Sequence, residues 1–151
     1  MSNEAAAGPV KQISIQKIYS KDMSFESPNS PQVFSEEWSP ETQLNLKSSH
    51  REVAEGVHEV VLTITVEAKK EDKSVFLIEL QQAGLFTING IEGSEKGAAL
   101  GSFCPSILYP YARETISAAV QRGGFPEFIL QPIDFDGLYA QSMKPQDQAT
   151  N

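Results

Sequence analysis

A lone cysteine and two histidines are the side chains of this sequence best suited to chemistry, and none has a partner at a useful spacing. Cys104 precedes Pro105 outside any catalytic cysteine motif, while His50 and His58 are eight positions apart with no cysteine nearby. A nucleophile needs a base beside it, and a zinc ion needs several such ligands close together. We therefore expect no catalytic residue, no metal site and no enzyme, with Cys104 as a buried thiol.

Glycines and aspartates do not change this expectation. Residues 83–101 are rich in glycine, but a phosphate loop ends in Gly-Lys-Ser/Thr, whereas Lys96 precedes a glycine. Asp134 and Asp136 have no histidine in their segment, and Asp136 is well placed to cap a short last helix. We expect no cofactor, and helix capping rather than acid-base chemistry from these carboxylates.

Binding of apolar chains has better support, because three apolar segments are broken or flanked by proline or glycine. They span residues 33–38, 85–91 and 125–135, which is more than a core of this size needs as covering loops. An adaptable apolar groove is what holding an unfolded chain requires. Trp38 fits a lid over the core equally well. The candidate contacts are Phe34, Trp38, Leu85, Phe86, Phe125, Phe128, Leu130 and Ile133.

Alternation of apolar and polar residues predicts the strands that position these segments. Residues 12–26 form one half-buried strand, whose inward side chains are Ile13, Ile15, Tyr19, Met23 and Phe25. Ile18 falls on the polar side, which a bulge or kink near Tyr19 would absorb. Residues 44–47 form a short strand before a polar turn at 48–56. Two further strands, 60–68 and 75–81, flank a charged hairpin turn at 69–73.

Strand parity also places carboxylates around one leucine. Asp22 and Glu26 share the even side of the first strand, and Leu77 and Glu79 share the outer side of the later one. A leucine ringed by acids is expected of a fast, salt-sensitive docking site for a basic segment. A plain solvated sheet face is the alternative.

Helical periodicity begins where the alternation ends, and it predicts one long helix over residues 103–124. Pro105 and Pro110 belong in a first turn or before the helix proper, and Gly123-Gly124 supplies the C-cap. The apolar stripe contains small residues, so we expect it to face a second copy of the helix. The residues of this expected interface are Leu108, Tyr111, Ala112, Thr115, Ile116 and Ala119.

Composition limits the class of protein. The 151 residues suit one domain, with residues 1–10 and 144–151 as flexible tails around a domain at 11–143. The net charge of −8 disfavours nucleic acid and anionic membrane as partners and favours basic ones. A single cysteine, no leader segment and no bilayer-length apolar run predict a soluble protein of the cytoplasm.

The run YPYARE at residues 109–114 carries a resemblance to a known family. With Cys104-Pro105 before it, and Arg122-Gly123 and Phe125-Pro126 after it, this run resembles the signature of the SecB protein-export chaperones. Residues 18–26 and 90–93 add to the likeness in the family's order, so that only the two polar ends carry none of it.

The resemblance implies a fold and a function. The fold is α+β, with a four-stranded antiparallel sheet, one long helix and a short C-terminal helix, assembling as a dimer of dimers through the long helices. The function is that of an ATP-independent holdase, which binds unfolded precursor proteins in the cytoplasm and delivers them to the SecA translocase ATPase. Carried over by motif, the Trp38 loop and residues 125–135 wall the precursor groove. The residues that dock SecA are Asp22, Glu26, Leu77 and Glu79.

Three other functions remain open at this point. A carrier of a small apolar ligand would close the same apolar loops into one pocket. A thiol enzyme would need an exposed, fast-reacting Cys104. Within the family, a chaperone dedicated to a toxin-antitoxin system would have the same sequence features as a general export chaperone.

Overall fold

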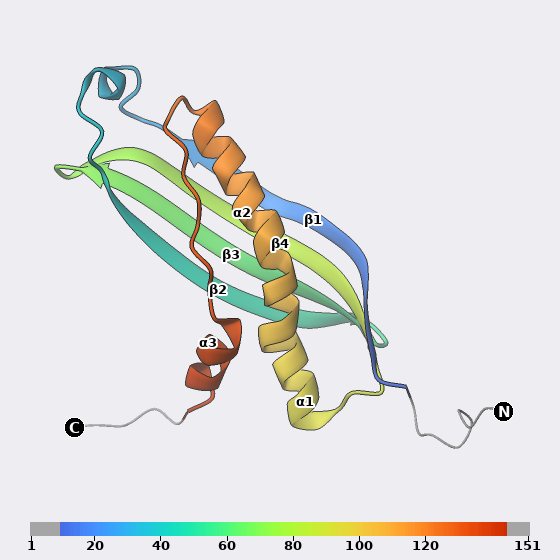
Figure 1. Ribbon diagram of the computed structural model, residues 1–151. Coiled ribbons are helices and arrows are strands. Elements are labelled where there is room, and N and C mark those ends of the chain that lie inside the picture. Colours follow the sequence, from blue (N-terminus) through green and yellow to red (C-terminus); the bar gives the residue numbers. More distant parts are fainter. Residues whose placement is uncertain (1–9, 145–151) are drawn as a thin grey trace.

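The computed structural model describes residues 10–144, in which one long helix crosses one face of a curved sheet (Figure 1). The elements in chain order are β1 (Gln12–Glu26), the 3-10 turn η2 (Gln32–Ser35), β2 (Glu41–Ala54), β3 (Val57–Lys70), β4 (Lys73–Asn89), α1 (Gly93–Ala98), the π-helical turn η3 (Ala99–Phe103), α2 (Cys104–Arg122) and α3 (Phe135–Ser142). The expected tails at 1–10 and 144–151 lie, apart from Val10 and Lys144, outside the described residues.

All four strands are antiparallel neighbours in the order β1-β4-β3-β2. This confirms the expected four-stranded antiparallel sheet. In its central pair, Ile64 of β3 lies opposite Leu80 of β4, and both side chains are fully buried. The predicted inward series of these two strands therefore covers one face, which carries the helix.

The edge strand β2 is longer than predicted. It pairs with β3 from Glu41 to Ala54, so the predicted turn at 48–56 is wrong and only Glu55 and Gly56 form the turn. Nearly every residue of β2 is exposed, because an edge strand of this sheet has little covering it. A strand that is exposed on both faces needs no alternation of apolar and polar residues along its whole length, so its full extent is not predicted. Backbone pairing with β3 holds the strand in place.

The predicted irregular segment at 85–91 is also wrong over most of its length, because β4 continues to Asn89. Gly84 is the first glycine of the glycine-rich residues 83–101. In the structure it lies where the helix passes closest, and a Cβ atom there would come within 3.0 Å of Leu108 Cδ2. Glycine in a strand often marks such a close approach.

Two register shifts in β1 account for the pattern around Ile18. They lie between Ile15 and Lys17 and between Ser20 and Asp22, each adding an unpaired residue to β1. Between the shifts the parity is inverted, so Ile18 packs against the core. Tyr19 lies on the opposite face, where its hydroxyl donates to Glu59, and its predicted inward position is wrong.

The helix begins earlier than predicted, since α1, η3 and α2 run on without a break from Gly93 to Arg122. Pro105 lies in the first turn of α2, one of the two places predicted for it, whereas Pro110 lies inside the helix, so the prediction is wrong for Pro110. The π-helical turn directly before Pro105 is one way a helix adapts to a residue without an N–H. At the other end, Gly124 adopts the left-handed conformation with a φ of 90°.

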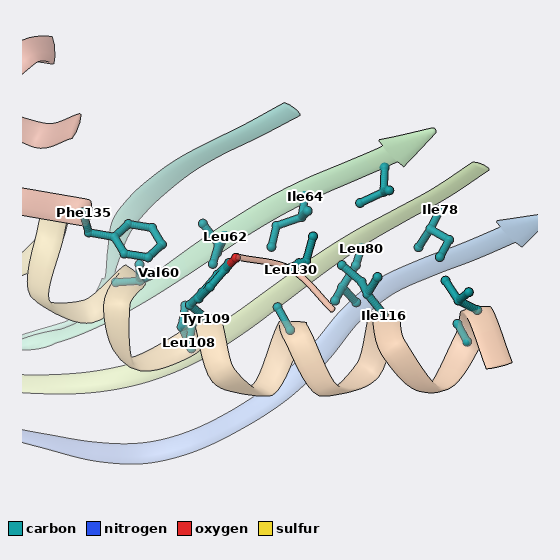
Figure 2. Packing of buried hydrophobic residues seen from close by; sticks show 14 of the residues in the cluster. Val60, Leu62, Ile64, Ile78, Leu80, Leu108, Tyr109, Ile116, Leu130 and Phe135 are labelled. Atoms are coloured by element: carbon teal, nitrogen blue, oxygen red, sulfur yellow. The ribbon is translucent and has the colours of Figure 1, made fainter. Parts of the chain in front are cut away.

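Helix α2 packs on the sheet of its own chain (Figure 2). Leu108, Ala112 and Ile116 are fully buried, and Ala119 is 7% exposed. These four residues face β3 and β4, so the stripe already has a partner within the chain. The prediction that this stripe meets a second helix is therefore wrong for them, while Tyr111 and Thr115 lie at its edge with more exposure.

Candidate binding surfaces

An aromatic cluster lies at one end of the sheet, where β1 ends and β4 begins. Its base is Phe76 against Phe125, with ring centroids 5.4 Å apart and both side chains buried. Phe34 and Trp38 lie 5.3 and 5.7 Å from Phe125, yet they are 51% and 44% exposed. Phe128 packs edge-on to Phe76 at 6.3 Å. We call these five residues the aromatic cluster.

Specific contacts hold the two outer rings in place. The loop before them is tied to the β3–β4 hairpin, because Asn29 donates to the Ser74 carbonyl at 2.8 Å and Lys70 donates to the Glu37 carbonyl at 2.6 Å. Val33 anchors the 3-10 turn in the core. Phe34 and Trp38 are therefore presented on a fixed loop above a buried aromatic base.

Residues 125–134 run from the aromatic cluster back along the sheet beside α2 (Figure 1). Leu130 is buried against the core, as Figure 2 shows, and Tyr109 donates a hydrogen bond to the carbonyl of Gln131. Phe128 and Ile133 are only partly buried, and Ile129 is 54% exposed. The segment thus adds an apolar edge beside the sheet.

A surface groove of about 570 Å³ opens between β2 and the end of this segment. Its apolar lining includes Leu44, Leu46, Ile133 and Leu138, of which Leu44 and Leu138 are about half exposed. A second groove of about 390 Å³ adjoins it and shares Leu46 and Leu138. We call the two together the apolar groove. Asp134 helps to build it by capping α3, where its Oδ1 accepts from the Gly137 N–H at 3.0 Å.

The predicted precursor contacts separate into groups in the structure. Phe34, Trp38, Phe125 and Phe128 come together in the aromatic cluster, while Leu130 and Ile133 lie further along the same segment. Phe86 is fully buried beneath the helix, and Leu85 is directed to the other face of β4. Leu44 and Leu46 were missed, although their alternation on an edge strand was a usable signal.

The predicted acidic arrangement occurs on the sheet face turned away from α2. Glu26 and Glu67 lie directly opposite Leu77 on its two neighbouring strands, and Glu79 pairs with Ser24. Asp22 lies on the same face of β1, opposite Gln81. Glu67 was missed, although the predicted hairpin already placed its strand beside that of Leu77. We call Asp22, Glu26, Glu67, Leu77 and Glu79 the acidic patch.

A buried carboxylate lies further along the same face. Glu59 accepts from Lys21 Nζ at 3.0 Å, from Arg51 Nε at 3.2 Å and from the Tyr19 hydroxyl. These hydrogen bonds, that of Tyr19 first, lower the pKa of Glu59 in spite of its burial. Burial and the neighbouring carboxylate raise the pKa of Tyr19 to about 12. Sequence reasoning missed this group, whose members come from three strands.

Cys104 is fully buried, as predicted, and this burial raises the pKa of its thiol to about 12. A thiol enzyme would need the opposite, an exposed thiol with a lowered pKa. Among residues 10–144, no three His, Cys, Asp or Glu side chains are grouped to hold a metal ion. None of the helices in that range is long and apolar enough to cross a bilayer.

Comparison with known proteins agrees with the geometry. The family model for the preprotein translocase subunit SecB matches residues 6–146. The protein-export protein SecB of Marinobacter nauticus is 47% identical over 97% of this chain and 91% of its own, and that of Nitrosococcus oceani is 49% identical over 94% and 88%.

A solved structure supports the fold alone. It is a SecB-like chaperone of Mycobacterium tuberculosis in complex with a peptide from an antitoxin, with a TM-score of 0.66, 16% identity, and coverage of 80% of this chain and 90% of that one. The closer sequence relatives are named for protein export, and their matches extend over nearly the whole chain. This chain therefore belongs to the SecB family, and its function is that of a protein-export chaperone.

Proposed function

We propose that this chaperone is an ATP-independent holdase of the cytoplasm, which holds precursor proteins unfolded on the aromatic cluster and the apolar groove. The observation that carries the proposal is the pair of half-exposed rings, Phe34 and Trp38, fixed above a buried aromatic base. Exposed apolar surface of this kind marks a binding site. Residues 125–134 connect the cluster to the groove, so one extended chain can follow both.

The proposal is tested by replacing the two exposed rings. Each buried aromatic anchor contributes about 1.5 to 3 kcal/mol, so Phe34→Ala with Trp38→Ala should weaken capture of a denatured precursor at least tenfold. The fold should persist, because both rings are half exposed. The control is Val53→Ala, which removes an apolar side chain of similar exposure, 41%, from β2. The measurement is competition for a labelled, denatured precursor.

Two outcomes would contradict this assignment. Unchanged capture in the double variant would place the binding surface elsewhere. Stoichiometric binding of a small apolar molecule, with no affinity for denatured protein, would instead indicate a ligand carrier.

We also propose that the acidic patch docks SecA, to which the held precursor is delivered. The patch presents Leu77 between Glu26 and Glu67, with Glu79 and Asp22 beside it on the same face. A small apolar contact ringed by carboxylates fits a basic segment, and its affinity should fall as salt rises. This surface lies on the face opposite the helix, so docking leaves the precursor surfaces free.

Glu79→Lys tests this docking, because it reverses a charge within the patch while the Glu79 side chain makes no hydrogen bond or ion pair within residues 10–144. Calorimetry with full-length SecA should show docking abolished, with precursor capture unchanged. Docking to the wild type should weaken as ionic strength rises. Equal affinity of variant and wild type, or no salt dependence, would refute the assignment.

We further propose assembly as a homotetramer, a dimer of dimers. Its support in the fold is apolar surface beside α2 rather than the buried stripe. Tyr111 is 50% exposed, and Ile15 and Met23 of the edge strand β1 are 48% and 41% exposed. A groove of about 460 Å³ lies between β1 and α2, lined by Ile18, Tyr111 and Thr115 among others. A second copy would cover these side chains.

A further inference from the structure

The sheet face turned away from α2 has opposite charge at its two ends. The acidic patch lies near the β3–β4 hairpin, around Leu77. The other end carries three cations, Lys17, Lys21 and Arg51, around the single carboxylate of Glu59, which gives three minus one, or a formal charge of +2. We call these four residues the basic cluster. Leu77, at the centre of the acidic patch, and Leu85, in the row of the basic cluster, are eight residues apart on β4, which is about 27 Å along a strand, while Asp22 at the edge of the patch directly follows Lys21 of the cluster.

Strand pairing fixes the basic cluster. Lys17 lies opposite Leu85, Leu85 opposite Glu59, and Glu59 opposite Arg51, so one row crosses all four strands. Lys21 is the unpaired residue at the second register shift of β1, and its Nζ lies 3.0 Å from each carboxylate oxygen of Glu59. The cluster therefore exists only because the order is β1-β4-β3-β2.

Within the basic cluster the carboxylate is buried and the cations are more exposed. The Glu59 side chain is 7% exposed, whereas those of Lys21 and Arg51 are 41% and 68% exposed. Arg51 uses only its Nε on Glu59, and within residues 10–144 its two terminal amino groups and the Lys17 ammonium have no hydrogen-bond partner. A guanidinium held by Nε presents its remaining donors outward as a fork, the geometry that binds a carboxylate.

We infer that this face is a two-ended docking surface, on which the SecA segment that meets the acidic patch also carries a carboxylate bound by Arg51 and Lys17. This inference rests on the proposed docking of SecA. Between Leu77 and Leu85 the central strands carry Val61, Thr63, Ala83 and Gln81 on this face, over which an extended segment of about eight residues can lie. The acidic patch on the same face repels nucleic acid and anionic lipid, which leaves a protein carboxylate as the ligand.

The second contact fixes the direction of the docked segment. A basic segment on an acidic patch alone could bind in either orientation. A carboxylate at one end pairs favourably with the basic cluster and unfavourably with the acidic patch, so only one orientation satisfies both ends.

Calorimetry with full-length SecA tests the inference. Lys17→Gln with Arg51→Gln should weaken docking about fivefold to tenfold, since two partly exposed ion pairs are lost, and should reduce the salt dependence. Glu59 keeps its bonds to Lys21 and Tyr19, so the sheet should stay folded. The matched control is Arg122→Gln, which removes an exposed positive charge at the end of α2 and should leave docking unchanged.

Unchanged docking in the double variant, while Glu79→Lys abolishes docking, overturns the inference and leaves the proposed function standing. Failure of the wild type to bind SecA rejects both. Should the double variant lose its fold, Lys17→Glu alone gives the answer, because the Lys17 side chain makes no hydrogen bond or ion pair within the described residues. It should weaken docking, and equal affinity would again overturn the inference.

Discussion

Glu59 shows how a single residue acquires a role that depends on its neighbours in space. In sequence it is a polar residue directly before the predicted strand at 60–68. In the structure its carboxylate joins Tyr19 and Lys21 of β1 to Arg51 of β2, across the intervening strands. A buried carboxylate is tolerable only when its oxygens are bonded in this way.

Replacing Glu59 should therefore cost stability in a pH-dependent way. Glu59→Gln should lower the free energy of unfolding by about 1 to 3 kcal/mol near neutral pH, because bonds to charged donors are lost from a buried site. The folded-state pKa is lowered, so this contribution is present above the unfolded-state pKa and is lost as pH falls through the folded-state value. Urea unfolding at a series of pH values would measure it.

The exposed Glu127 provides the comparison for this measurement. Glu127→Gln should change the stability by less than about 0.5 kcal/mol at every pH. A difference between wild type and Glu59→Gln that does not shrink on acidification would contradict the assigned role of the carboxylate.

At the scale of elements, the contact of α2 with β4 depends on Gly84. A Cβ at this position would lie 2.9 Å from Phe86 Cε2, 3.0 Å from Leu108 Cδ2 and 3.2 Å from the Lys17 carbonyl. The first two atoms belong to fully buried side chains that cannot move freely. The absence of a side chain at this point lets the helix lie directly on the sheet.

Gly84→Ala should thus destabilise the chain by about 1 to 3 kcal/mol, since overpacking in a well-filled core displaces its neighbours. Thermal unfolding would show a lowered midpoint. Thr87→Ala, three residues along on the opposite face of the same strand, should have a smaller effect. An unchanged midpoint for Gly84→Ala would mean that the helix can shift without cost.

Helices and strands that bury one face and expose the other were predicted best from the sequence. The paired strands β3 and β4 and the α2 stripe bury one face, and their alternation or periodicity was predicted correctly. The edge strand β2 is exposed on most of its length, so only the alternation at residues 44–47 was readable and the rest of the strand was not predicted. The glycines of residues 83–101 favoured an irregular segment, and Pro110 favoured a break before the helix. Strand pairing to Asn89 and the helical segment that precedes Pro110 override these local preferences.

The candidate sites followed the same rule. Residues on one strand could be assigned to a face by parity, which gave most of the acidic patch. The basic cluster depends on strand order and on two register shifts in β1, which no local pattern reveals. The sequence predicted which apolar segments contribute to the aromatic cluster. That Phe125 is buried and Phe34 exposed is known only from the three-dimensional structure.

At the scale of the whole molecule, two sides of α2 have different roles. The side bearing Leu108, Ala112, Ile116 and Ala119 belongs to the core of the chain. A charge introduced at Ala119 would meet this core without a counter-ion, so it would unfold the chain rather than divide an assembly. The side bearing Tyr111 remains available for a second copy.

Tyr111→Glu and Ala119→Glu should therefore behave differently, and their contrast tests the proposed tetramer. Tyr111→Glu places a charge on half-exposed apolar surface, so sedimentation should show a smaller species whose far-ultraviolet dichroism is unchanged. Ala119→Glu should lower the unfolding temperature by several degrees or prevent folding, because a buried charge costs several kcal/mol. Val53→Glu, with the same added charge on β2, should remain tetrameric. A monomeric wild type, or a tetramer of unchanged stability in Tyr111→Glu, would rule out assembly through this side of the helix.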